Sequence, residues 1–284
     1  MNILEYAKRD PNTGMLLCGN YQSDPELVEK VARAVMCIGD KSSACTCASC
    51  SLPLQEHPDY EQVDGDSVSV ERMREILAKE EYPALAKKRM LVVRAADQLR
   101  PEAANALLKE LEEGQNRRIM LFTAEKELTV LPTIRSRVQI FWVPPFADFE
   151  LASWMAERKT PYEELYWMAS GGMVNKVPLI TSKLELLQKV KDAALKPAPE
   201  GCLDFLTAMH LLKEKDQNAV TDRETLELVV NLLEALCEKQ LQEGLQEREQ
   251  IQRIADRLGQ IEEFSGQIRT AGVTDVFRFI VSLY

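Results

Sequence analysis

The chain has 284 residues, enough for two or three domains, and 45% of them are hydrophobic, which permits sizeable buried cores. Its net charge of −10 argues against a protein that grips nucleic acid alone over a broad surface, because neutralising phosphates needs clustered Lys and Arg. Two histidines argue against a His-based metal site or catalytic triad. We find neither a bilayer-spanning apolar run nor a secretion signal, so we expect a cytoplasmic protein without membrane contact.

Alternating strands and helices are predicted for the first 145 residues. The chain GMLLCG at 14–19 is an apolar strand, and a helix follows it, with Ser23 or Asp24 as its N-cap and Pro25 in its first turn. Further strands are expected at 59–64, 89–93, 117–124 and 138–143, and further helices at 70–81 and 101–113, with a short helix or turn before the last strand. This alternation is typical of an α/β domain with a mainly parallel sheet.

The character of the sequence changes after Pro144 and Pro145. Two short helices are expected at 146–160 and 161–172, with Gly171 and Gly172 ending the second. Beyond about residue 180 the pattern is helical throughout, with apolar stripes at helical spacing within 226–241 and 251–268. These stripes favour a packed helical bundle over a ligand site.

The loop after the first strand lacks the residues of a phosphate-binding loop. Counting from Gly19, the positions for the second Gly, the Lys and the hydroxyl of G-x-x-x-x-G-K-[ST] hold Asp24, Pro25 and Glu26. The two carboxylates repel phosphate, and proline removes a backbone donor. An ordinary capped helix is the better interpretation.

The tip of the strand at 89–93 is equally poor for nucleotide hydrolysis. Strands that serve such sites end in acidic residues, which hold magnesium and activate water. Here the tip is Arg94 followed by Ala95, and Asp97 is expected only to begin the turn before Pro101. Two separate halves of one nucleotide site are therefore missing.

Four of the seven cysteines fall within residues 37–50, with the spacing Cys37-x7-Cys45-x1-Cys47-x2-Cys50. In a reducing compartment such a cluster indicates metal binding before disulfides. The one-residue gap between Cys45 and Cys47 strains chelation by both sulfurs, so His57 or water could replace Cys45. The alternative is a loop of reduced, free thiols.

Residues 14–145 resemble the AAA+ ATPase module of clamp-loader subunits of bacterial DNA polymerase III. The segments HPDYEQVD, VERMREI, KKRMLVVRAADQL, AANALLKELEE and LPTIRSRVQIF stand in the order that this family shows. The resemblance is looser to about residue 180 and rests beyond that on helical character alone. It implies a RecA-like AAA+ domain with a parallel sheet over 1–145, a small helical lid domain over 146–180 and a C-terminal helical collar domain over 181–284.

The resemblance also implies roles for individual residues. The family's S-R-C motif matches Ser136-Arg137-Val138, which makes Arg137 an arginine finger for the ATP site of a neighbouring subunit, with Arg135 as the residue most easily mistaken for it. Bacterial members often carry a four-cysteine zinc module after the first helix, which implies structural zinc on Cys37, Cys45, Cys47 and Cys50.

The function implied is that of a non-hydrolysing stator that binds no ATP itself. Its partners would be the delta and gamma or tau subunits, the sliding clamp, and primed DNA through the assembled complex. Two alternatives stay open: an ATP-hydrolysing subunit of the gamma or tau kind, and a zinc-bearing DNA-binding protein. Asp24, Glu26 and Arg94 oppose the first alternative, and the acidic net charge opposes the second.

Overall fold

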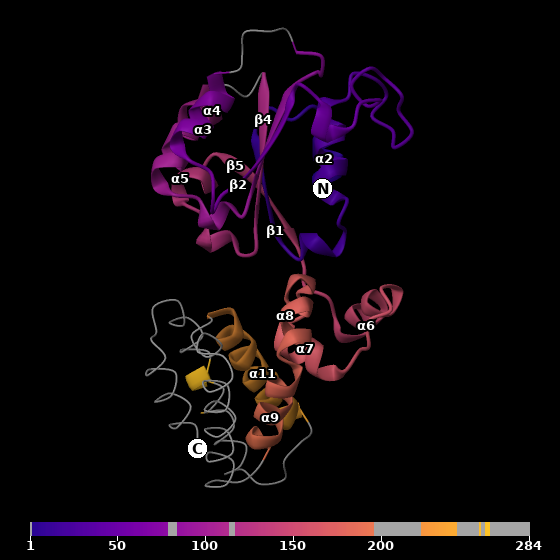
Figure 1. Ribbon diagram of the computed structural model, residues 1–284, viewed down its shortest axis with the longest axis vertical. Helices are drawn as coiled ribbons and strands as arrows, with labels where there is room; N and C mark the ends of the chain where they lie inside the picture. The colour runs from indigo at the N-terminus through magenta and orange to yellow at the C-terminus, as the bar shows by residue number, and fades with distance from the viewer. Residues whose placement is uncertain are drawn as a thin grey trace. The chain divides into compact units, whose positions relative to one another are not determined.

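The computed structural model describes residues 2–78, 84–113, 117–195, 223–242, 256 and 259–261. The chain divides into two compact units, Met1–Pro144 and Pro145–Tyr284 (Figure 1). The helices and strands of the first unit are α1 (Ile3–Lys8), β1 (Gly14–Gly19), α2 (Leu27–Met36), β2 (Tyr60–Asp64), α3 (Val70–Ala78), β3 (Arg89–Arg94), α4 (Pro101–Glu113), β4 (Arg118–Ala124), α5 (Pro132–Arg135) and β5 (Val138–Val143).

The first unit is built on a five-stranded sheet with the order β2-β3-β4-β1-β5, in which every neighbouring pair is parallel. β1 is a central strand because its six residues GMLLCG are all buried, as expected for a strand covered on both faces. The expected α/β architecture is confirmed. This strand order, with the covering helices, is that of a RecA-like AAA+ domain.

Helices cover both faces of this sheet (Figure 1). Met15 and Leu17 of β1 pack with the buried residues of α1 and α2, whereas Leu16 and Cys18 pack on the opposite face with those of α3 and α4. The alternation follows from the strand period of two, which sends successive side chains to opposite faces. Each face of β1 therefore has its own hydrophobic core.

The second unit is helical, and nothing described in it is a strand. Its helices are α6 (Asp148–Glu157), α7 (Glu164–Ser170), α8 (Val177–Ser182), α9 (Leu184–Ala194) and α11 (Arg223–Gln242). One core joins them, to which Leu226, Val229, Val230 and Leu233 of α11 contribute, as the apolar stripe predicted. The expected stripe over 251–268 lies almost entirely outside the described residues. No described helix is long and apolar enough to cross a membrane.

Two glycines end α7 as expected. Gly171 is the C-cap in the left-handed region, with a φ of 59°. Gly172 has a φ of 77°, and a Cβ there would lie 2.1 Å from the carbonyl oxygen of Phe146. The close approach lets the Phe146 N–H donate to the Gly172 carbonyl at 3.0 Å. Any side chain at Gly172 would push these two segments apart.

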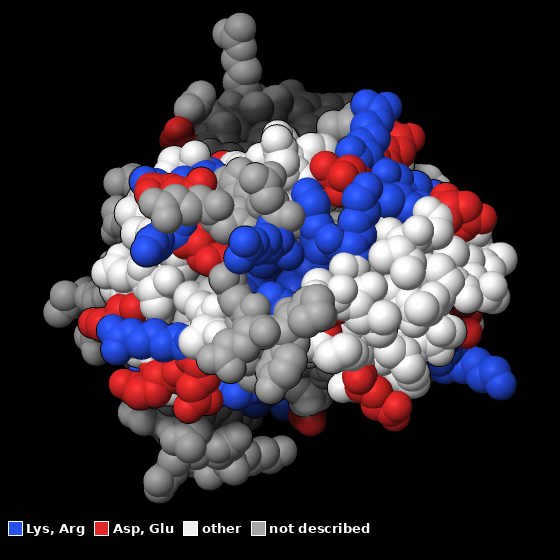
Figure 2. Space-filling view, turned by 90° about the horizontal axis from the view of Figure 1, so that it is seen from above, with Lys and Arg blue, Asp and Glu red and all other residues white. Residues whose placement is uncertain are grey.

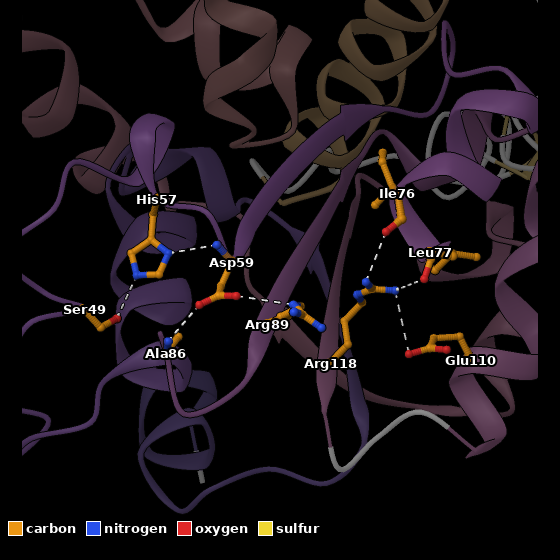
Figure 3. Close-up of polar contacts among 9 residues, drawn as sticks. All are labelled: Ser49, His57, Asp59, Ile76, Leu77, Ala86, Arg89, Glu110 and Arg118. Atoms are coloured by element: carbon orange, nitrogen blue, oxygen red, sulfur yellow. Dashed lines mark hydrogen bonds and ion pairs between the residues drawn. The ribbon is translucent and has the colours of Figure 1, made fainter. Parts of the chain in front are cut away.

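Arg118, at the first position of β4, stabilises the C-terminal end of α3 (Figure 3). Its guanidinium donates to the carbonyl oxygens of Ile76 at 3.1 Å and Leu77 at 3.4 Å, and Glu110 lies 3.8 Å away. The residue is 5% exposed. A cation at this end of a helix satisfies carbonyls that have no partner within the helix.

We expect Arg118→Ala to lower the free energy of unfolding by roughly 2–4 kcal/mol, because it leaves buried carbonyls and Glu110 without this cation. The neighbouring and exposed Arg117 is the matched control, and Arg117→Ala should cost less than about 1 kcal/mol. Urea denaturation followed by circular dichroism measures both. Equal losses in the two variants would contradict a special role for Arg118.

Candidate metal centre and nucleotide edge

The loop between β1 and α2 bonds to itself. Gly19 ends β1 with a φ of 84°, and a Cβ there would lie 2.2 Å from the carbonyl oxygen of Val143. The N–H of Ser23 donates to Asn20 at 3.0 Å, and the N–H of Leu27 donates to the Asp24 carbonyl at 3.0 Å. In a phosphate-binding loop such N–H groups point at the ligand. Here protein oxygens accept these bonds.

The expected N-cap of α2 is wrong. The helix begins at Leu27, and Glu26 is its N-cap without a side-chain bond. Asp24 instead accepts the N–H of Glu26 on its Oδ1 at 3.0 Å, which closes a turn before the helix. Pro25 consequently precedes the first turn. The sequence pattern could not separate these neighbours, because Asp favours such turns as strongly as it favours N-caps.

Charge at this loop is set by Asp24, Glu26 and Lys30. The ammonium of Lys30 lies 3.0 Å from Asp24 and 3.3 Å from Glu26. The hydrogen bond to Asp24 foremost, and then the bond to Glu26, raise the pKa of Lys30 above its ordinary value and outweigh the lowering by desolvation. Two carboxylates thus surround one ammonium. The loop carries a negative excess where a nucleotide would bring more negative charge.

The end of β3 is exposed and carries Arg94, followed by Ala95 in the left-handed region with a φ of 46°. Carboxylates do lie nearby. The pKa of the Cys18 thiol is raised to about 12, by burial foremost and then by the charges of Glu127 and Asp97. Sequence reasoning gave Asp97 only a turn, because its proximity to Cys18 depends on strands that are distant in the chain.

Arg137 is held by contacts within its own subunit. Its Nε and Nη2 lie 2.7 and 2.6 Å from Oε1 of Glu112 on α4, and its Nη1 donates to the Thr133 carbonyl at 3.0 Å. The side chain is 34% exposed. Arg135 lies on the same short segment, with its Nη1 3.9 Å from Glu127 and a smaller exposed fraction of 24%. Of these two, Arg137 is the more accessible.

The four cysteine sulfurs of residues 37–50 gather at one point. All lie within 4.8 Å of one another, with Cys37 3.6 Å from Cys45 and 3.9 Å from Cys47. Four sulfurs at the usual Zn–S distance of about 2.3 Å in a tetrahedron stand about 3.8 Å apart. The set therefore fits one metal ion. The Cys45-x-Cys47 spacing does not prevent both sulfurs from joining it.

Backbone N–H groups point at two of these sulfurs. Gly39 donates to Cys37 at 3.3 Å, and Cys50 donates to Cys47 at 3.5 Å. The bond from Cys50 is the largest of the causes that lower the pKa of Cys47 to about 6. Gly39 has no room for a side chain, because a Cβ would lie 2.7 Å from the Cys45 sulfur. The bond to Cys47 favours the thiolate of that residue, the form that binds metal, whereas burial foremost raises the pKa of Cys50.

Arg33 joins α2 to the segment of residues 37–50 that carries the four cysteines, which we call the cysteine loop. The helix delivers Cys37 at its C-cap. Nη1 of Arg33 then donates across the loop to the carbonyls of Cys50 at 3.1 Å and Leu52 at 3.3 Å, while Glu29 pairs with Nη2 at 2.9 Å. The end of the loop, at Cys50 and Leu52, is thereby fixed to the helix that supplies the first cysteine.

His57 ties the same loop to the sheet (Figure 3). Its Nδ1 accepts the N–H of Asp59 at 3.1 Å, so Nε2 carries the proton and donates to the hydroxyl of Ser49 at 3.1 Å. His57 is 3% exposed, and burial foremost lowers its pKa. Both ring nitrogens are in use, so the suggestion that His57 replaces Cys45 as a ligand finds no support.

This arrangement is not a catalytic triad. The carboxylate of Asp59 turns away from His57 and accepts the N–H of Ala86 at 2.8 Å and Nε of Arg89 at 3.3 Å (Figure 3). A triad needs that carboxylate on the imidazole to orient it. The contacts instead join the cysteine loop, β2 and the start of β3 into one rigid piece.

Curated relatives match part of the chain. A protein named DNA polymerase III subunit delta' from Haemophilus influenzae is 30% identical over 57% of this chain and 51% of its own length. Proteins of the same name from Bacillus subtilis and Escherichia coli are 29% and 28% identical over 38% and 48% of this chain. The matched stretch thus spans about half, or less, of these relatives.

A solved structure of a DNA polymerase III gamma subunit-related protein from Thermotoga maritima covers 99% of this chain at 16% identity, with a TM-score of 0.43, too distant a likeness to carry an argument. The family model described as DNA polymerase III, delta subunit, matches residues 4–147. That stretch holds the parallel sheet, the cysteine cluster and Arg137, and is half of the chain. The chain belongs to this family.

Proposed function

We propose that the chain is a non-hydrolysing subunit, of the delta-prime kind, in the clamp loader of a bacterial DNA polymerase III. Its family membership and the names of its relatives support a place in that assembly. The observation that carries the non-hydrolysing role is the loop between β1 and α2, in which the N–H groups of Ser23, Glu26 and Leu27 already have protein acceptors.

The partners in this proposal are the delta and gamma or tau subunits, the sliding clamp and primed DNA. The scaffold of a nucleotide site is kept because it shapes one wall of a neighbour's ATP site. Its acids are absent because this subunit would turn over no ATP. The boundaries of the lid at 146–180 and of the collar at 181–284 belong to the same proposal.

Arg137 is the residue that would act on the neighbour. Its bond to Glu112 joins two half-exposed side chains, and such pairs contribute about 1 kcal/mol or less. The guanidinium could therefore exchange Glu112 for a more strongly charged phosphate at little cost. Once there, it would offset charge that develops on the γ-phosphate.

Zinc is the metal that the four cysteines suit best. Thiolates in a closed tetrahedral set are typical of structural zinc, and no described carboxylate or imidazole completes an open coordination position in this cluster. When bound, the ion would supply a cross-link rather than chemistry. Cys37, Cys45, Cys47 and Cys50 would hold it, while Arg33 and His57 fix the loop around it.

The nucleotide prediction is tested by calorimetry. We expect no binding when the chain is titrated with millimolar ATP and Mg²⁺, because the N–H groups of Ser23, Glu26 and Leu27 already have protein acceptors and two carboxylates outnumber the one ammonium of the loop. The variant Asp24→Asn/Glu26→Gln, which removes two charges and keeps an Asx oxygen, should also fail to bind. Tight binding by the unaltered chain would refute the non-hydrolysing role and favour a gamma or tau kind of subunit.

The arginine prediction needs the assembled clamp loader. We expect Arg137→Ala to silence the adjoining ATP site, since an arginine finger is worth roughly 10³–10⁵ in rate, and so to lower total ATP turnover by that site's share. Arg135→Ala is the matched control and should leave turnover unchanged. The isolated Arg137→Ala chain should melt normally. Unchanged turnover with Arg137→Ala would remove the finger assignment, and loss only with Arg135→Ala would transfer it.

The metal prediction is tested by metal analysis of the purified chain. We expect about one zinc per chain, lost in Cys45→Ser and in Cys47→Ser and kept in the control Cys237→Ser, whose sulfur lies in α11. His57→Gln should also keep its zinc, although its melting temperature falls. Retention of zinc by Cys45→Ser together with loss by His57→Gln would make His57 the fourth ligand.

A further inference from the structure

Basic side chains gather on one face of the first unit, although the chain as a whole is acidic. Figure 2 shows Lys and Arg concentrated there with few acidic residues between them. The first unit also holds a group that we call the lysine edge: Lys41, Lys87 and Lys88 around Asp10. Lys87 and Lys88 lie just before β3, and Lys41 comes from the cysteine loop.

Two of the three lysines pair with one carboxylate, that of Asp10. Asp10 lies 2.9 Å from the ammonium of Lys87 and 3.5 Å from that of Lys88. Lys88 is buried and also donates to the carbonyl oxygen of Pro11. Lys41 donates to the carbonyl oxygen of Lys8 at 2.9 Å. The lysine edge therefore holds three positive charges against one negative charge.

The backbone has left-handed conformations at two residues of this group. Asp10 has a φ of 65° and Lys41 a φ of 59°, both in the left-handed region that residues with a side chain seldom adopt. Such strain costs of order 1 kcal/mol or more and is typical of ligand sites. Burial foremost, and then Lys87, lowers the pKa of Lys41, as expected for like charges held close. An anion is the ligand that would relieve this repulsion.

The residue types favour phosphate over a protein surface. Protein interfaces are poor in Lys and rich in aromatic side chains, whereas Lys meets phosphate as a point charge. The exposed apolar side chains that adjoin these segments are aliphatic: Ile38 in the cysteine loop and Leu85 before β3. No stacking platform for the bases of a single strand is thus present in the described part of this edge.

We propose that the lysine edge binds the phosphate backbone of double-stranded nucleic acid without reading its sequence. Lys87 and Lys41 would contact phosphates, while buried Lys88 adds to the local positive field. The proposal rests on the proposed function and extends it. It assigns duplex DNA to a surface that includes neither the loop between β1 and α2 nor Arg137.

The cysteine loop would set the strength of this surface. Lys41 lies between the first two cysteines of the cluster, and Asp40 fixes the turn beside it by accepting the N–H of Ser42 at 3.0 Å. A metal ion that closes the loop would hold Lys41 against the edge. This dependence rests on the proposed zinc, whereas the contact made by Lys87 does not.

The test measures binding of a short fluorescein-labelled DNA duplex to the full chain by fluorescence anisotropy over a series of salt concentrations. We expect Lys41→Gln/Lys87→Gln to weaken binding and to reduce the slope of log affinity against log salt by about 2. The control Lys109→Gln/Lys126→Gln makes the same change of net charge at two exposed lysines of α4 and the segment after β4, and should retain most of the binding. Thermal melting checks that both variants fold.

Three outcomes overturn the proposal: unchanged binding in Lys41→Gln/Lys87→Gln, an equal loss in the control, or equally tight, lysine-dependent binding of poly-glutamate, which would indicate an acidic protein partner. Zinc removal by a chelator should weaken the unaltered chain and leave Lys41→Gln unaffected. A chain that holds one zinc but binds no duplex would refute the lysine edge while leaving the metal assignment intact.

Discussion

Asp59 is the side chain on which the arrangement of the first unit most depends. Its carboxylate accepts the N–H of Ala86 and the Nε of Arg89, and its carbonyl accepts the N–H of Met90, so one residue fixes the whole entry to β3. Its own N–H fixes the ring of His57. A buried carboxylate persists only when its oxygens are satisfied, and here the partners come from separate segments. The entry to β3 and the cysteine loop therefore depend on the same contacts for their order.

That coupling gives the proposed zinc a structural purpose. The residues between Cys37 and Cys50 form neither helix nor strand and are mostly exposed, so a cross-link by the ion would order them. Once ordered, the cysteine loop places Ser49 on His57 near one end and Lys41 on the last carbonyl of α1, that of Lys8, near the other. The ion would thus act at a distance, through the backbone that it fixes.

Much of the first unit could be predicted from the sequence, because strands buried on both faces leave continuous apolar runs. β1 and α4 have the bounds expected, and the spacing of four cysteines within residues 37–50 correctly predicted that they cluster. What sequence could not give is contact across the sheet. The turn made by Asp24, the proximity of Asp97 to Cys18 and the anchoring role of His57 each depend on segments brought together only by folding.

The two ends of the parallel strands differ in local charge, and the net charge of the chain does not show this difference. In the loop after β1, Asp24 and Glu26 outnumber Lys30, and the N–H groups of Ser23, Glu26 and Leu27 are already bonded. At the start of β3, lysines outnumber their single aspartate. Charges farther apart than about 10 Å are largely screened at moderate salt. A partner at either end of the strands therefore meets the local charge of that end. By our two proposals, this acidic chain leaves nucleotide unbound at the loop after β1 and binds phosphate near the start of β3.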